Sequence, residues 1–195
     1  IGAVCGLLLT VAGAVTGPRK QANAQAEEMR HVLRVLGIGF PEKAPAAELV
    51  DIFQRMVKVE ESEDGYVRYR FDGSADGSLL PCIALPLAGP GLWGPIKGFL
   101  SVDPDLRTIR GVTFHEQEET PGLGGEIGSE WFCSQFEGKA LRDEAGKPGI
   151  LIQPGGAAAA NGVDAITGAT MTSTKVQANL NAAIKQELEG GKDNG

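Results

Sequence analysis

Cysteine and histidine are scarce in this chain, which has 195 residues but only three cysteines and two histidines. It has no Cys-x-x-Cys pair and no cluster of cysteine with histidine, so the sequence argues against a zinc or iron–sulfur centre of its own. A Ser-His-Asp triad cannot be assembled with any assurance from two histidines. Since Cys5 falls in an uncharged segment, Cys82 and Cys133 are the pair left for a disulfide.

Basic residues are outnumbered, with 18 Lys and Arg against 25 Asp and Glu and a formal net charge of −7. Nucleic acid binding needs a positive surface that neutralises phosphates, so we expect no nucleic acid partner. The hydrophobic fraction of 42% is typical of a folded chain, and the length suits one domain. No Gly-x-Gly-x-x-Gly follows a predicted strand and opens a helix, which argues against a nicotinamide site.

Charge is absent from residues 1–17, IGAVCGLLLTVAGAVTG. A membrane-spanning helix needs about 20 apolar residues, so we expect this run to be the end of a longer transmembrane helix that starts upstream. A signal-peptide core is the alternative, since such cores hold about 7–15 apolar residues before a cleavage site. We expect a stalk helix and linker over 18–40, the soluble domain over 41–190 and a disordered tail over 191–195.

Hydrophobic periodicity in the rest of the chain predicts an α+β fold in which helices flank an antiparallel sheet. Apolar positions at helical spacing predict helices at Gln21–Leu36, Pro45–Val57, Ser129–Phe136 and Thr172–Leu188. Alternation of apolar residues with arginine predicts a strand at Tyr66–Phe71. Further strands are predicted at Leu79–Leu85, Ile96–Val102, Thr108–Phe114 and Gly149–Gln153. Asp103-Pro104-Asp105 predicts a hairpin between the third and fourth of these strands, and Ala157–Ala160 predicts a loop.

Two segments carry patterns suited to ligand binding. DAITGATMTS, residues 164–173, runs from a strand end through Gly168 into the last predicted helix. Free N–H groups and hydroxyls at a helix start favour an anion such as a phosphate. ETPGLGG, residues 119–125, follows a strand and has glycines that let a ligand approach the backbone. From composition alone, a Thr/Ser helix cap and an ordinary Pro-Gly turn are the simpler interpretations.

Together the two segments resemble the signatures of a known family. DAITGAT resembles the flavinylation motif D-x-x-[S/T]-G-A-[T/S] of FMN-binding domains, and HEQEETPGLGGEI resembles the E-T-P-G-L-G signature upstream in the same domains. The domain over 41–190 is thus similar to NqrC of the sodium-translocating NADH:quinone oxidoreductase (Nqr) and to RnfG of the Rnf complex. The amino-terminal apolar run and GLWGPIKGFLSVDPDLRTIRGVTF extend the resemblance over most of the chain.

The resemblance implies where the flavin is held. It assigns Thr170 as the residue that carries FMN through a phosphoester bond, and it implies that a separate flavin transferase reads a motif that includes Asp164. No residue is implied as catalytic or as a metal ligand. The other implied flavin contacts are Thr167, Gly168, Ala169 and Thr172 beside the attachment point, and Glu119, Thr120, Gly122, Leu123 and Trp93 around the ring, although Trp93 could equally be a core residue.

The resemblance also implies a function. It describes a covalently flavinylated electron-transfer subunit of an ion-translocating oxidoreductase of Nqr or Rnf type, with the other subunits as partners and NADH oxidation on one of them. The implied location is the inner membrane, single-pass, with the flavin domain on the periplasmic side. A membrane-tethered flavin sensor outside such a complex is the alternative, and a substrate reductase would need a second catalytic domain. His115, just before ETPGLG, is a weaker candidate for tuning the flavin.

Overall fold

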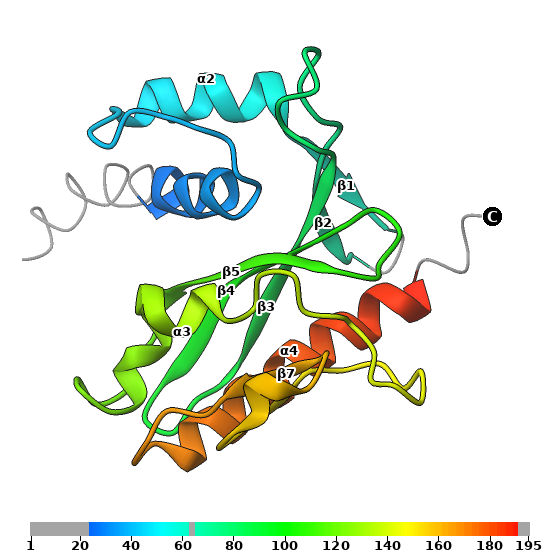
Figure 1. Ribbon diagram of the computed structural model, residues 1–195. Helices are drawn as coiled ribbons and strands as arrows, with labels where there is room; N and C mark the ends of the chain where they lie inside the picture. The colour runs from blue at the N-terminus through cyan, green and yellow to red at the C-terminus, as the bar shows by residue number, and fades with distance from the viewer. Residues whose placement is uncertain (1–23, 63–64, 191–195) are drawn as a thin grey trace, which may run out of the picture.

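The computed structural model describes residues 24–62 and 65–190, and Figure 1 shows their arrangement. Within these two ranges no helix is both long enough and apolar enough to cross a membrane. The transmembrane segment expected at 1–17 and the tail expected at 191–195 lie outside the described residues. The described part has the α+β fold expected from the sequence, an antiparallel sheet flanked by helices.

A five-stranded antiparallel sheet forms the centre of the fold, with its strands side by side in chain order. The predictions for its second, fourth and fifth strands are confirmed to within two residues, as is the hairpin between the last two. The first strand could not be predicted because its sequence, KVEE, is short and mostly charged. The strands are β1 (Lys58–Glu61), β2 (Val67–Phe71), β3 (Cys82–Pro90), β4 (Pro95–Val102) and β5 (Ile109–Glu116).

Strand β3 differs from its prediction at 79–85, because it begins at residue 82 and continues to residue 90. Leu79 belongs instead to a turn, in which its N–H donates to Ser74 Oγ at 2.9 Å and its carbonyl accepts from the Ser74 N–H at 3.0 Å. The strand tolerates two prolines because β2 pairs with it only up to Ala84, so that one edge of its second half has no strand partner.

Two helices cover one face of the sheet: the helix over residues 24–35, and α2 (Ala46–Met56), which confirms its prediction to within one residue. Leu33 is buried in a hydrophobic cluster with Phe71 and Phe99 of the sheet. Residues 24–40 therefore belong to the folded domain, and the stalk expected over 18–40 is wrong for this part. Apolar residues at helical spacing suit a stalk or a core helix, and only the tertiary contact separates the two.

The other face of the sheet packs against α3 (Glu130–Ser134), α4 (Thr170–Gly190) and a small parallel pair of strands, β6 (Leu151–Gln153) and β7 (Gly162–Asp164). Figure 1 shows α4 and β7 on the side of the sheet opposite α2. The predicted α3, α4 and β6 are confirmed, whereas β7 is too short to produce a periodic pattern. A short 3-10 helix, η2 (Gly156–Ala158), forms where a loop was expected.

The two described cysteines are free. Cys82 packs in the cluster beneath the helix over 24–35, with its Sγ 3.6 Å from the Leu36 carbonyl, whereas Cys133 Sγ lies 3.3 Å from the Ile127 carbonyl. Burial raises the pKa of both thiols, that of Cys133 to about 11. The disulfide considered for this pair is not formed, and neither thiol is activated as a nucleophile.

Candidate functional site

The first turn of α4 presents an exposed threonine beside free backbone donors. Thr170 is the first residue of the helix and is exposed. Within the described residues, the N–H groups of Thr170, Met171 and Thr172 have no protein acceptor, and the first that has one is Ser173, which donates to the Ala169 carbonyl at 2.9 Å. These donors lie at the positive end of the helix dipole, where an anion such as a phosphate is stabilised.

The turn before α4 fixes how the chain enters the helix. Gly168 has a φ of +78°, in the left-handed region that favours glycine. The Ala169 N–H donates to the Ile166 carbonyl at 3.0 Å, and the buried Ser173 hydroxyl accepts from the Ile166 N–H at 3.3 Å. Ser173 thus ties the turn to the helix, because the N–H group that it accepts lies before α4. Within the described residues, no Thr or Ser side chain of this cluster accepts one of the free N–H groups of the first turn, so helix capping does not account for the cluster.

Glu119 is a buried polar residue that ties the two motif segments together, and it is only 4% exposed. One carboxylate oxygen accepts the N–H groups of Leu92 at 2.7 Å and Trp93 at 3.3 Å, and the other accepts the Thr172 hydroxyl at 2.6 Å. Charge-assisted hydrogen bonds of this kind satisfy a buried carboxylate. Glu119 thereby fixes the turn over 91–94 and the start of α4 relative to the ETPGLGG loop.

A cavity of about 280 Å³ opens where these three segments meet. The large apolar side chains on its lining are strongly exposed, and they are half of all such side chains that the described residues expose. An exposed apolar group of this kind marks a binding surface. The four are Leu92 (41% exposed), Trp93 (69%), Leu123 (43%) and Met171 (62%). Sequence reasoning missed Leu92 and Met171, although each is the chain neighbour of a predicted site residue.

Most of the residues expected to hold the flavin line this cavity, namely Trp93, Glu119, Thr120, Leu123, Gly168, Ala169, Thr170 and Thr172. Thr167 and Gly122 are exposed in the adjoining turns and do not line it. Asp164 is also outside the cavity, because its carboxylate accepts the Ala157 N–H at 3.1 Å and its own N–H donates to Gln135 Oε1 at 2.9 Å. Asp164 therefore supports η2 and the end of β7.

These residues fit a flavin mononucleotide. The free donors of α4 suit its phosphate, and the apolar side chains suit a flat aromatic ring. Close packing maintains this shape, since a Cβ added to Gly124 would lie 2.5 Å from Thr172 Oγ1. Ligand pockets are commonly about 300–1,000 Å³, so a cavity of about 280 Å³ would leave part of a bound ring open to solvent.

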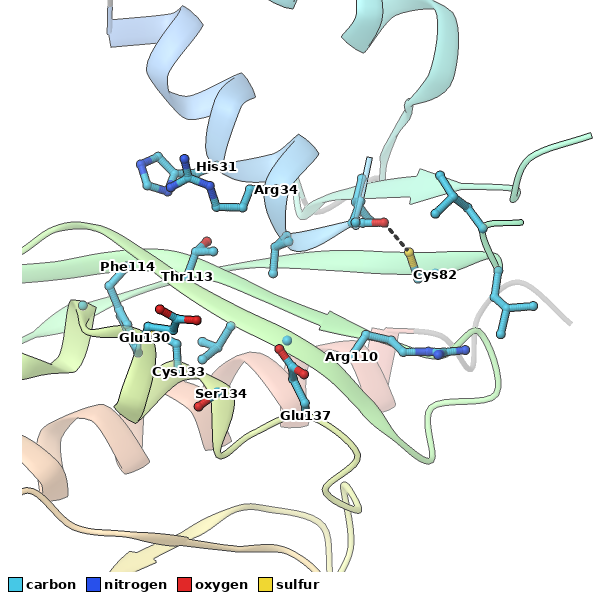
Figure 2. Close-up of a pocket in the computed structure, with 18 of the residues that line it drawn as sticks. His31, Arg34, Cys82, Arg110, Thr113, Phe114, Glu130, Cys133, Ser134 and Glu137 are labelled. Carbon is cyan, nitrogen blue, oxygen red and sulfur yellow. Dashed lines mark hydrogen bonds between the residues drawn. The ribbon is translucent and has the colours of Figure 1, made fainter. Parts of the chain in front are cut away.

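A second and larger cavity, of about 850 Å³, lies against β5 and shares no lining residue with the smaller one (Figure 2). Neither motif segment contributes to it. His115 lines neither cavity: its ring stacks on Phe99 with centroids 5.2 Å apart and lies 5.5 Å from the ring of His31. This position beneath the helix over 24–35 gives no support to the idea that His115 tunes a flavin.

Comparison with known proteins bears directly on this geometry. The FMN-binding domain family matches residues 91–185, a range that includes every residue lining the smaller cavity. The NqrC subunit of the Na(+)-translocating NADH-quinone reductase of Vibrio campbellii is 31% identical over 216 residues, which cover 89% of this chain and 83% of that protein. The corresponding subunit from Vibrio vulnificus is 45% identical over 104 residues, which cover 52% of this chain.

The matched segment spans only 41% of the length of the Vibrio vulnificus protein. Among solved structures, the crystal structure of the same subunit of the Na(+)-translocating NADH-quinone reductase from Parabacteroides distasonis superimposes with a TM-score of 0.71 at 26% identity. That likeness covers 87% of this chain and 94% of the crystallised chain. The likeness in fold therefore extends over most of both chains.

Proposed function

Because the chain belongs to the NqrC family of Na(+)-translocating NADH-quinone reductase subunits, we propose that it is a covalently flavinylated electron carrier in a membrane complex of this type. The observation that best supports this function is the cavity in which both motif segments meet beside the exposed Thr170. FMN takes up two electrons and passes them on singly, and this chemistry belongs to the cofactor. The chain attaches the cofactor, orients it and limits its contact with water.

Thr170 is the proposed attachment residue, because the other hydroxyls of the first turn of α4 are engaged. Thr172 donates to Glu119, the Ser173 oxygen accepts from the Ile166 N–H, and Thr174 donates to the Thr170 carbonyl at 2.9 Å. Within the described residues the Thr170 hydroxyl is thus the one without a protein partner in this turn. The charge remaining on an esterified phosphate would face the free N–H groups at the start of the helix.

The ring is proposed to lie across the exposed apolar side chains, with Trp93 and Leu123 in direct contact. Thr120, Gly168 and Ala169 also line the cavity and would contact the bound flavin. Glu119 acts as a positioning residue, because both its oxygens are occupied by protein donors. A cavity of this size would leave part of a bound ring near the surface, as electron exchange with another redox centre requires.

The setting of this carrier is part of the proposal. Residues 1–17 would belong to a single transmembrane helix in the inner membrane, with the flavin domain on the periplasmic side. The partners would be the other subunits of a sodium-pumping complex, on one of which NADH is oxidised, and relatives named for this reductase favour the Nqr type over Rnf. The flavin transferase would read a segment whose shape Asp164 maintains through η2.

Fluorescence of the denatured chain tests the proposal. When the chain is produced together with the flavin transferase and separated in a denaturing gel, we expect a fluorescent band that persists without native structure. Thr170→Ala should abolish this fluorescence completely, because it removes the ester oxygen. Thr174→Ala, one turn later on the same helix and also exposed, should retain it. Fluorescence of the Thr170→Ala band would contradict the proposal. Absence of fluorescence from the band of the unsubstituted chain, produced together with the transferase, would contradict it as well.

A further inference from the structure

Among the residues that the structure describes, none pairs with the outer edge of β5 over most of its length. β5 is the last strand in the order of the sheet. Its first residue is covered, because the Ile109 N–H donates to the Lys139 carbonyl at 2.8 Å and the Ile109 carbonyl accepts the Gly138 N–H at 2.9 Å. Over 110–115, no described segment outside the sheet forms a backbone hydrogen bond with the strand. Such an edge is a template for pairing with another extended chain.

Two walls make this edge the floor of a groove, which is the larger cavity (Figure 2). Residues 31–37 form one wall, residues from 128 to 137 form the other, and residues 110–114 of β5 lie between them. Residues from 78 to 82 complete the lining. Five extended residues span about 17 Å at about 3.4 Å each, and the volume is about 850 Å³. A second copy of this chain would bring the same walls beside its own recessed β5, so the groove suits a single extended segment better.

The two walls carry charges of opposite sign that form no ion pair with another described residue. Arg34 lies on the wall formed by residues 31–37. Glu130 and Glu137 lie on the wall formed by residues from 128 to 137, and all three side chains are exposed. None of the three forms an ion pair with another described residue. Because side chains of a strand alternate between its faces, a segment paired with β5 would direct one set toward Arg34 and the other toward the glutamates.

We infer that this groove binds an extended peptide segment of another protein as a sixth strand of the sheet. The segment carries an acidic side chain toward Arg34 and basic side chains, at odd spacing from it, toward Glu130 and Glu137. Backbone pairing with residues 110–115 provides the affinity, and the charges fix direction and register. Because the groove shares no lining residue with the smaller cavity, docking there leaves the flavin contacts intact.

Amide hydrogen exchange of the full chain tests this inference with a synthetic peptide of about nine residues. The peptide alternates Thr and Val around one Asp and two Lys placed at odd spacing from it. At saturating peptide, exchange at 110–115 should slow about fivefold or more, while the amides around the smaller cavity keep their rates. The same peptide with its pairing amides N-methylated should give no protection. Unchanged exchange at 110–115, or equal protection by the methylated peptide, would overturn the inference.

Charge variants test the direction of binding. Glu137→Lys should weaken the peptide about three- to fivefold, as expected for an exposed ion pair, and exchanging only the peptide lysine that faces position 137 for aspartate should restore the affinity. Glu144→Lys is the matched control, because Glu144 is exposed and does not line the groove. Equal weakening by both variants would reject the groove as the binding site.

Discussion

Two cavities, the smaller beside Thr170 and the larger along β5, differ in how their chemistry is encoded. The smaller, of about 280 Å³, is assembled from a glycine-rich loop, a helix start and a buried glutamate, and exposed apolar side chains surround it. The larger, of about 850 Å³, lies along a strand edge between walls of opposite charge. Converging polar groups and an apolar surround suit a small ligand, whereas free backbone and alternating charge suit a polypeptide. The volume of a cavity alone does not show which of these two kinds of ligand it binds.

Replacing Glu119 should damage the smaller cavity most. Glu119→Ala leaves the N–H groups of Leu92 and Trp93 and the Thr172 hydroxyl without their acceptor, and each hydrogen bond to a charged group contributes about 1.5–3 kcal/mol. We expect the free energy of unfolding in urea to fall by at least about 3 kcal/mol. Glu118→Ala, at an exposed neighbour, should change it by less than about 0.5 kcal/mol. Similar losses in both variants would show that Glu119 does not hold the three segments together.

A methyl group added at Gly124 should separate the same contacts more gently. Its Cβ would lie 2.5 Å from Thr172 Oγ1 and 2.8 Å from Glu119 Oε2, so the loop must move away from α4. We expect Gly124→Ala to lower the free energy of unfolding by about 1–3 kcal/mol. The matched control is Gly128→Ala, where a Cβ meets nothing within 4 Å. A neutral Gly124→Ala variant, measured by the same urea titration, would show that the loop is not closely packed.

Trimming Trp93 should affect the flavin without affecting the fold. Trp93 is 69% exposed, so Trp93→Ala costs little stability but uncovers one side of the proposed ring. In the flavinylated chain we expect iodide to quench the flavin fluorescence about twofold more strongly, because the loss of the indole gives iodide access to one more face of the ring. Trp131→Ala, at a tryptophan 55% exposed and outside the cavity, should leave quenching unchanged. Equal quenching in both variants would place the ring elsewhere.

The histidine pair beside the larger cavity should give the smallest effect. Burial lowers the pKa of His31 and His115 from 6.5, and their proximity lowers that of His31 further. Below about pH 6.5 the unfolded chain therefore binds more protons than the folded chain. The free energy of unfolding is fully retained above about pH 6.5 and falls as the pH decreases toward the pKa values of the folded state. The charged groups that act on the pair are Glu27, Arg30 and Arg34 at His31, and Glu28, Glu116 and Lys97 at His115.

Urea denaturation at about pH 7.5 and about pH 5.5 measures this effect. The free energy of unfolding should be lower at the acid pH, and the difference should shrink in the double variant His31→Gln with His115→Gln. Within residues 24–62 and 65–190, Nδ1 of each ring has no hydrogen-bond partner, so the substitutions break no described bond at that atom. A pH difference that persists unchanged in the double variant would assign it to other groups.

Much of the fold follows from periodicity, and the failures have physical causes. α2 and α4 are long amphipathic helices, and β4 and β5 are bounded apolar runs, so local pattern suffices for them. The helix over 24–35 has the same pattern, but its burial against Phe99 is a tertiary fact that spacing does not contain. The start of β3 depends on the turn in which Leu79 bonds to Ser74, and apolar spacing does not reveal this turn. β7 depends on its pairing with β6 and is too short to show a period.

The site was predictable where a motif carries it. Thr170, Leu123 and Gly168 belong to local signatures and do line one cavity. The acceptor role of Glu119 was not predictable, because its donors lie 26, 27 and 53 residues away in the chain. Leu92 and Met171 look like ordinary core residues in the sequence, and only their exposure reveals a surface that a ligand could cover.

Tandem mass spectrometry of the peptide that contains Thr170 tests the proposed flavin attachment most directly. The chain should be produced in a host that has the flavin transferase and then digested with the flavin still attached. We expect the Thr170 side chain to carry the added mass of a whole FMN joined through its phosphate, which is the mass of FMN less one water. Thr167, Thr172 and Ser173 should be unmodified. An unmodified Thr170, or FMN found on one of those neighbours, would contradict the attachment and with it the proposed carrier.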